Sequence, residues 1–274
     1  NSGFYVRGGN ADQNLILLDD APIYNAGHLF GFFSIFNADA IKNVSLIKGG
    51  MPAQYGGRLS SVLDIAMKEG NDKQMQVDAG IGLIASRLSI QGPLKKDKAS
   101  FIISARRTYI DALTKPFVKK TSQFYGSGYY FYDLNLKMNY RFSDKDRLYV
   151  SGYFGRDVFD FVNGQRSLDV NIPWGNATGT IRYNRVFNKR LFGNTSLVYN
   201  SYRFKFDAAQ SSFKVQLNSG IRDISLKQDF DLYPFTGHKV KFGGAFILHQ
   251  YTPSVVSGSQ DSIQFKPQNA QVKN

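Results

Sequence analysis

The sequence lacks cysteine altogether, and it contains one tryptophan and one glutamate, Glu69, among 274 residues. Without cysteine, neither a disulfide framework nor a thiolate metal site can form. No run of about 18 apolar residues occurs, which excludes a membrane-spanning helix. The histidines His28, His238 and His249 do not stand at a metal-ligand spacing, and no H-E-x-x-H motif is present. No metal, no cofactor and no catalytic residue is predicted.

Aromatic residues, by contrast, are abundant. Sixteen Tyr and 23 Phe bring the aromatic share to 15%, while the mean hydropathy is only −0.30. Aromatic residues favour strands, and the lumen-facing half of a barrel strand lowers the average hydrophobicity of a membrane protein. Two classes stay open at this point, namely a soluble all-β protein and a transmembrane β-barrel.

The formal net charge of +13 is unevenly distributed. Residues 1–72 carry five basic and seven acidic groups, a net charge of −2. The remaining residues carry 29 basic and 14 acidic groups, a net charge of +15. The basic residues are scattered among alternating segments instead of gathering on one helix or arm, so the charge does not predict nucleic-acid binding.

The first 72 residues have a mixed α/β pattern. Leu15–Leu18 is an unbroken apolar run, which is typical of a strand buried on both faces. Asn37–Lys42 is predicted to be a short helix, with Asn37 as its N-cap and Asp39 near its positive end. The paired glycines at 8–9, 49–50 and 56–57 mark tight turns, and none has the spacing of a phosphate-binding loop.

From Gln74 onward, apolar and polar residues alternate. The clearest case is Tyr130–Phe142, where every second residue is apolar and those between are Phe131 and then Asp, Asn, Lys or Arg. A change of phase predicts a bulge near Ser86, within the first of these strands. About eight antiparallel strands are predicted up to Tyr251.

The connections between these strands alternate in length. Short turns are predicted at 93–98, 143–146, 188–190 and 233–239, whereas 111–128 and 157–176 are long, and the segment from Thr252 has no strand pattern. This alternation is typical of outer-membrane barrels. Aromatic residues near strand ends then predict an interfacial girdle, although aromatics also simply suit strands. The girdle residues are Tyr125, Tyr129, Tyr130 and Trp174.

The size of the first segment constrains the barrel. Eight strands would close around an interior already filled by side chains, whereas a lumen that holds a plug needs on the order of 22 strands. If residues 1–72 fill the lumen, most of the barrel follows Asn274. With no signal peptide visible at Asn1, we expect the sequence to be a trimmed piece of a longer chain.

Four blocks carry a family resemblance: the Arg-Gly pair within 3–9, the run 15–22 with L-D-D-A-P, the run 40–50 with L-I-K-G-G, and Y-G-G within 55–65. In this order they resemble the second half of the plug of TonB-dependent outer-membrane receptors. Asp20 and Gly50 replace the Gly and Pro usual in that family. The resemblance implies an α+β plug at residues 1–72, followed at 73–274 by the first part of an antiparallel transmembrane β-barrel. The R-G-G and L-I-K-G-G variants resemble the branch with an upstream carboxypeptidase-regulatory-like domain.

The resemblance implies active import across the outer membrane of a Gram-negative bacterium. TonB, coupled to the proton gradient through ExbB and ExbD, would pull on the plug and open a path. Lipids and lipopolysaccharide of the outer membrane, and a surface lipoprotein, are the further partners considered. Glycans, peptides, metal chelates and corrinoids all stay open as ligands. The alternative is a plugged barrel that serves as a scaffold or docking subunit. An enzyme is not predicted, because no spacing supports a pair such as Ser104 or Ser151 with His249.

Three groups of residues are predicted to act in the plugged pore. Arg7 and Arg58 either form ion pairs with the barrel wall or cap local turns. Loop residues that would touch a ligand are Asn10, Asp12, Gln13, Tyr24, Asn25 and His28. The basic lumen-facing residues are Arg106, Lys137, Arg141, Arg182, Arg222 and Lys241. They favour an anionic ligand; alternatively, they balance the acidic plug or meet lipopolysaccharide phosphates.

Overall fold

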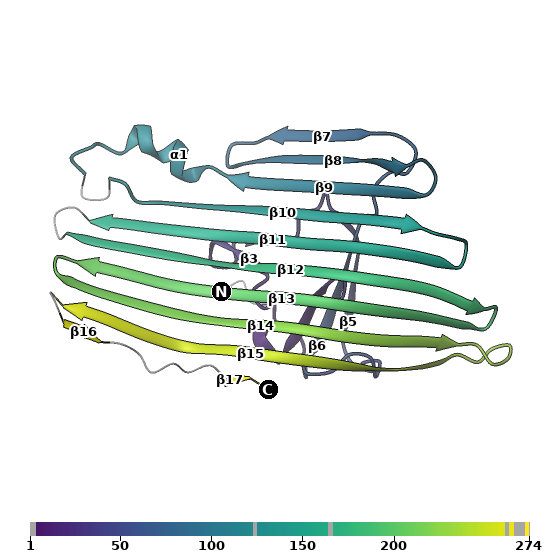
Figure 1. Ribbon diagram of the computed structural model, residues 1–274. Helices are drawn as coiled ribbons and strands as arrows, with labels where there is room; N and C mark the ends of the chain where they lie inside the picture. Colours follow the sequence, from purple (N-terminus) through teal and green to yellow (C-terminus); the bar gives the residue numbers. More distant parts are fainter. Residues whose placement is uncertain (1–3, 123–124, 164–166, 261–262, 266–271, 274) are drawn as a thin grey trace.

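The computed structural model describes residues 4–122, 125–163, 167–260, 263–265 and 272–273. A small sheet formed by the first strands lies behind a much larger antiparallel sheet (Figure 1). We call residues 4–72 the plug and the nine strands β7–β15 of the larger sheet the wall. The face of the wall that contacts the plug is its inner face, and the opposite face is its outer face.

The plug sheet is built around β1, whose apolar side chains are buried or half-buried, as the unbroken apolar run predicts. β1 pairs in parallel with β6 and antiparallel with β2, and β6 pairs antiparallel with β5. Leu18, Ile35, Ile65 and Met67 form the core, and Tyr153 of the wall joins them. The elements are η1 (Ala11–Gln13), β1 (Asn14–Leu18), β2 (Ala21–Pro22), β3 (Gly27–His28), η2 (Leu29–Gly31), β4 (Phe33–Ser34), β5 (Ile41–Ile47) and β6 (Ser61–Met67).

The helix predicted at 37–42 is wrong. The Asn37 side-chain oxygen accepts a hydrogen bond from the Asp39 N–H at 3.1 Å, and the Asn37 carbonyl accepts one from the Ala40 N–H at 3.0 Å. This local bonding closes a single turn, which competes with a helix. β5 then begins at Ile41 and pairs with β6.

The wall strands follow one another in space in the order of the sequence, each antiparallel to the next. The segment between β9 and β10 holds α1 (Ile110–Thr114) and η3 (Lys115–Phe117), and β15 also pairs with the short β16 (Ile263–Phe265) and β17 (Val272–Lys273). The wall strands are β7 (Gln76–Ile81), β8 (Ala85–Lys95), β9 (Ala99–Thr108), β10 (Gly128–Arg141), β11 (Asp146–Asn163), β12 (Leu168–Asn188), β13 (Leu191–Gln210), β14 (Phe213–Leu232) and β15 (Val240–Gln260).

The first predicted wall strand is in fact a hairpin. β7 and β8 pair antiparallel, with Ile81 opposite Ser86, and the turn between them spans 82–84. The change of phase near Ser86 is therefore a reversal of direction and not a bulge. This hairpin raises the number of wall strands in the described residues from the predicted eight to nine.

Two segments predicted as loop or tail are strand. β11 continues to Asn163 and β12 begins at Leu168, so most of the predicted connection 157–176 is paired, and β15 runs on to Gln260. In this part of the wall the apolar residues change face. Phe159 and Ile172 lie opposite each other on the inner face, whereas Asp160 and Asn171 lie on the outer face. A pattern read for one apolar face misses such an extension.

Elsewhere in the wall, the alternation confirms the predicted two faces. Val150, Ile181, Leu197, Leu226 and Phe246 form one continuous row on the outer face. The inner face of β10 instead carries polar side chains that are buried against the plug, namely Asp133, Asn135, Lys137 and Asn139.

The prediction of an interfacial aromatic girdle is wrong for two of its four residues, Tyr129 and Trp174. Tyr129 and Trp174 are 6% and 5% exposed and form an inner-face cluster with Phe131, against which Leu29 and Phe33 of the plug pack. Neither residue lies on the outer face. Tyr129 is an even number of residues from Asp133, so both project from the inner face of β10, and Trp174 lies opposite Asp157 of the inner face.

The chain crosses from plug to wall between Met67 and Gln76 and runs closely along the inner face. The Glu69 carbonyl accepts hydrogen bonds from the Ser100 hydroxyl at 2.7 Å and from Asn139 Nδ2 at 2.9 Å. Gly70 has a φ of +82°, and a Cβ there would lie 2.2 Å from the Phe101 carbonyl oxygen, so only glycine fits. The domain boundary at 72/73 stays a prediction.

Candidate functional site

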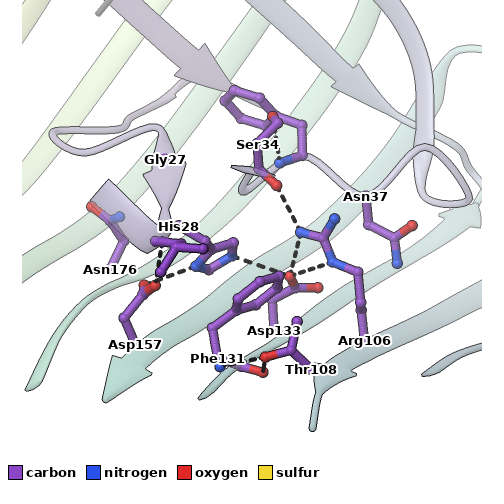
Figure 2. A network of polar contacts seen from close by, with 12 residues as sticks. Gly27, His28, Ser34, Asn37, Arg106, Thr108, Phe131, Asp133, Asp157 and Asn176 are labelled. Atoms are coloured by element: carbon purple, nitrogen blue, oxygen red, sulfur yellow. Dashed lines mark hydrogen bonds and ion pairs between the residues drawn. The ribbon is translucent and has the colours of Figure 1, made fainter. Parts of the chain in front are cut away.

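The densest contact between plug and wall surrounds His28, at the end of β3 (Figure 2). The His28 side chain is 1% exposed. Its Nδ1 lies 2.8 Å from Asp157 Oδ2, and its Nε2 lies 3.2 Å from Asp133 Oδ2. The ring stacks on Phe131 with centroids 3.9 Å apart. Because each nitrogen faces a carboxylate, the site suits a protonated imidazole that donates from both nitrogens.

The strand register brings these groups together. Phe131 lies opposite Asp157, and Asp133 lies two residues further along β10, so all three project from the inner face. On the plug side, Gly27 permits the tight loop that presents His28. Its N–H donates to Asn25 Oδ1 at 3.1 Å, and a Cβ there would lie 2.7 Å from the Gly31 Cα.

Arg106 of β9 supplies a second cation to this cluster. Its Nε and Nη2 lie 2.9 and 2.6 Å from Asp133 Oδ2, and Nη2 also donates to the Ser34 carbonyl of the plug at 2.7 Å. Asp157 Oδ1 accepts from the Leu29 N–H at 3.1 Å and from the Tyr129 hydroxyl. Two carboxylates thus face one guanidinium and one imidazole, and the cluster is charge-balanced only when His28 is protonated.

The pKa of His28 reflects this arrangement. Burial by itself lowers the pKa, but the hydrogen bonds and charges of Asp133 and Asp157 outweigh it and raise the pKa above the ordinary 6.5. The two carboxylates therefore favour the imidazolium form of His28, which donates to both of them across the plug–wall contact.

Retention of the plug is expected to weaken as the pH rises. A folded-state pKa above the unfolded value means that the stabilisation is complete below the unfolded pKa and is lost as the pH rises through the folded pKa. Asp133, Asp157, Arg106 and Tyr129 are the charged or titratable groups that face His28. Limited proteolysis of the plug between about pH 6 and pH 9 measures this loss. Retention that increases with pH would contradict the assignment.

A second contact joins Tyr24 and Asn25 to the middle of the wall. The Tyr24 hydroxyl donates to Asp223 Oδ2 at 2.6 Å, and His249 Nδ1 lies 2.7 Å from Asp223 Oδ1. Burial, followed by the bond to Asp223 and its charge, raises the pKa of Tyr24, so the hydroxyl remains a donor. Asn176 Nδ2 donates to the Asn25 carbonyl at 2.7 Å.

Ion pairs between acidic plug residues and basic wall residues form the third contact. The Asp19 carboxylate lies 2.9 Å from Lys137 Nζ, with side chains only 4% and 7% exposed. The uneven charge of the sequence is thereby explained in part, because the basic wall balances the acidic plug. The remaining pairs are Asp20 with Arg182 at 2.7 Å, Glu69 with Arg147 at 2.7 Å, and Asp39 with Arg87.

The structure places the predicted lumen-facing basic residues in different surroundings. Arg106, Lys137 and Arg182 contact the plug as described above. Lys241 Nζ lies 3.3 Å from Gln54 Oε1 of the plug, and Arg141 donates to the Asp97 carbonyl at 2.5 Å.

Arg222 corrects the prediction for the lumen. It lies opposite Ser201 and Gln250, whereas the neighbouring Asp223 faces the plug. Arg222 has the parity of Ile224 and Leu226, which are exposed on the outer face, and it lies on that face with them.

Among the strands that the structure describes, no wall residue forms an ion pair with Arg7 or Arg58. Arg58 Nη1 donates to the neighbouring Gly57 carbonyl at 2.8 Å, and the Arg7 guanidinium lies over Gly49. These local contacts favour the alternative considered above, in which each arginine caps a turn, and ion pairing with the barrel wall stays a prediction. The acidic residues of the plug make the wall ion pairs instead.

The predicted ligand residues fall into two groups. Asn10 and Asp12 are exposed and Gln13 is half-buried, and Gln13 Oε1 accepts from the Asn10 N–H at 3.1 Å. Their contact with a ligand stays a prediction. Tyr24, Asn25 and His28 contact the wall, and the geometry gives them an anchoring role.

Pattern reading missed Asp19, Asp20, Asp157 and Asp223. Asp157 fell within a predicted loop, and Asp19 and Asp20 lay in a family block. One signal was available, because Asp223 lies on the opposite face of its strand from the apolar Ile224 and Leu226, at a position that must face the lumen.

Over the described ranges, no group of three or more His, Cys, Asp or Glu side chains could hold a metal ion. In the same part of the chain, no helix has both the length and the apolar character to cross a membrane.

Comparison with known proteins gives a family match for the plug. Residues 1–61 match the family model described as the TonB-dependent receptor plug domain. No curated protein matches the chain.

Solved structures share the fold of the whole chain. Three are a pyoverdine-bound FpvA of Pseudomonas aeruginosa (13% identity, TM-score 0.63), the ferric enterobactin receptor PfeA of the same organism (14%, 0.61) and the ferric preacinetobactin receptor BauA of Acinetobacter baumannii (13%, 0.61). They cover 100%, 89% and 98% of this chain. The chain in turn spans less than half of each, at 41%, 42% and 46%. At these identities the likeness shows the fold.

Proposed function

We propose that this chain, a member of the TonB-dependent receptor family, forms the plug and part of the wall of an active importer in the outer membrane of a Gram-negative bacterium. The importer would take up a ligand from outside, and TonB, energised through ExbB and ExbD, would remodel the plug. Receptors of this family are transporters and not enzymes.

The observation that carries this proposal is the chemistry of the plug–wall contact. Within the described residues, ion pairs and hydrogen bonds join the plug to β8–β15, while the shared apolar contacts involve Tyr153 and the Tyr129–Trp174 cluster. Polar contacts of this kind hold a closed state firmly but can exchange for water when a force opens the site. A seal that must open repeatedly needs this property.

The ligand belongs to the same proposal. The basic residues Arg106, Lys137 and Arg182 are occupied by plug or wall partners, so they no longer favour an anionic ligand. Ferric chelates are the first class to test, because the structures with this fold include receptors named for ferric enterobactin and ferric preacinetobactin. No observation favours the scaffold alternative.

A reversible tether between plug and wall tests the proposal. Asn37 Nδ2 of the plug donates to Ser104 Oγ of β9 at 2.8 Å, and the chain has no cysteine of its own. In the whole receptor, the variant Asn37→Cys/Ser104→Cys is expected to form a disulfide in the oxidising outer membrane. Energy-dependent uptake of ferric chelates should stop in the oxidised protein and return after reduction.

The two single cysteine variants are the controls, and both should transport with and without reductant. Uptake that persists through a fully formed disulfide would show that the plug does not leave this part of the wall. Uptake that is insensitive to loss of the proton gradient would overturn active import itself.

A further inference from the structure

The outer face of the wall changes character at a defined height. Ile224 and Leu226 are 47% and 52% exposed, and neighbouring strands add Ile181, Leu197 and Phe246 to this apolar band. The ten residue-to-residue steps from Arg222 to Leu232, the end of β14, span about 33 Å along the strand. A tilt of about 40° reduces this to about 25 Å, which is the height of the apolar band of an outer-membrane barrel.

Four arginines lie on the outer face directly above this band. Arg107 and Arg156 both lie opposite Tyr132, one on each side, and Arg156 and Arg203 both lie opposite Gly175. Arg222 lies one row lower on the next strand. Because barrel strands tilt, a belt at one depth must step between rows in this way.

These arginines have few partners. All four are exposed. Arg107 lies 3.7 Å from Asp111, and its side chain remains 56% exposed. Arg156, Arg203 and Arg222 have no ion pair with any residue that the structure describes. This contrasts with Arg106 and Arg182 of the inner face, which pair with Asp133 and Asp20.

Above the belt the two faces exchange character. On the outer face, Asp160 and Asp207 both lie opposite Asn171. On the inner face, Phe161 and Ala208 both lie opposite Val170. Acidic residues on the outer face indicate that this part of the wall stands in water. The arginines therefore mark the level between hydrocarbon and water, where lipid headgroups lie.

We propose that Arg107, Arg156, Arg203 and Arg222 form a phosphate-binding belt that holds phosphorylated glycolipid headgroups of the outer leaflet. The inference rests on the proposed function in placing the wall in the outer membrane. The leaflet follows from the long connection between β9 and β10, which leaves the wall beside Arg107, because outer-membrane barrels have short periplasmic turns and longer extracellular loops. The planar guanidinium group binds two phosphate oxygens at once, which favours arginine over lysine at such a site. Neighbouring arginines can share one bisphosphorylated headgroup.

Lipid retention by the whole receptor, purified in a non-ionic detergent, tests the belt. The variant Arg156→Gln/Arg203→Gln/Arg222→Gln should bind lipid A bisphosphate roughly a hundredfold more weakly than the unmodified protein, since each surface charge contributes about fivefold. Native mass spectrometry of lipid A titrations measures this. Dephosphorylated lipid A should bind both proteins equally weakly.

Arg185→Gln is the matched control. Arg185 also lies on the outer face, beyond Tyr183 at the opposite end of the apolar band. Its side chain is 53% exposed, lies 3.8 Å from Asp146 and stacks over the Phe187 ring. Its removal should leave lipid binding unchanged. Equal binding by the triple variant would overturn the belt, as would inorganic phosphate that binds as tightly as lipid A. Ferric chelate uptake by the unmodified receptor reports separately on the proposed function.

Discussion

Replacement of Lys137 by methionine is expected to destabilise the plug–wall contact by about 3 to 5 kcal/mol, the cost of leaving a buried charge unpaired. Lys137 Nζ lies 2.9 Å from the Asp19 carboxylate and donates to the Met67 carbonyl at 3.0 Å. Methionine fills a similar volume but leaves Asp19, 5% exposed, without a counter-charge. The urea concentration at which the plug becomes sensitive to protease should fall accordingly.

A double-mutant cycle separates charge from packing. Asp19→Asn removes the orphan carboxylate, and asparagine tolerates the left-handed backbone of Asp19, whose φ is +46°. The double variant Asp19→Asn/Lys137→Met should therefore recover much of the lost stability. Lys42→Met is the control, because the Lys42 side chain is 59% exposed and its ion pair with Glu69, at 3.4 Å, is a solvated surface contact. It should cost less than about 1 kcal/mol. If the double variant is no more stable to urea than Lys137→Met, the contact does not depend on charge pairing.

The sequence predicts the wall where one rule governs a whole strand. In β10, lipid on one side and polar partners on the other enforce strict alternation, so the inner positions of Lys137 and Asn139 follow from parity alone. The same rule fails in β11 and β12. Beyond Asp157, polar residues such as Asp160 and Asn171 occupy the outer side, and Phe159 and Phe161 lie on the inner side. The segment therefore has the composition of a loop although it is a paired strand.

The contacts of the candidate site could be predicted less completely from the sequence, for a different reason. Parity shows that Lys137 faces inward, but it cannot identify Asp19 as its partner, 118 residues away in the sequence. Arg7 and Arg58 were the natural choice for plug ion pairs, because they are the only arginines of the plug. The charge asymmetry was the better guide, since an acidic plug within a basic wall requires plug acids and wall bases to meet.

Replacement of His28 by leucine is expected to have the largest effect on closure of the pore. Asp133 and Asp157 would then share one cation, Arg106, in a site where His28 is 1% exposed. An unbalanced buried carboxylate costs about 3 to 5 kcal/mol, and water entering to solvate it would separate the plug from the wall. Cells with this variant of the whole receptor should admit an antibiotic too large for ordinary porins.

Two further variants distinguish charge from shape at this site. His238→Leu makes the same substitution in an exposed turn and should leave the barrier intact. His28→Leu/Asp157→Asn removes one carboxylate together with the histidine and should restore much of the seal, since the side-chain amide introduced in place of Asp157 can still accept the hydrogen bond of the Tyr129 hydroxyl. Leakage should also lose its pH dependence in both His28 variants. A leak in the double variant as large as in His28→Leu would mean that the stacked ring on Phe131, and not the charge balance, closes this part of the pore.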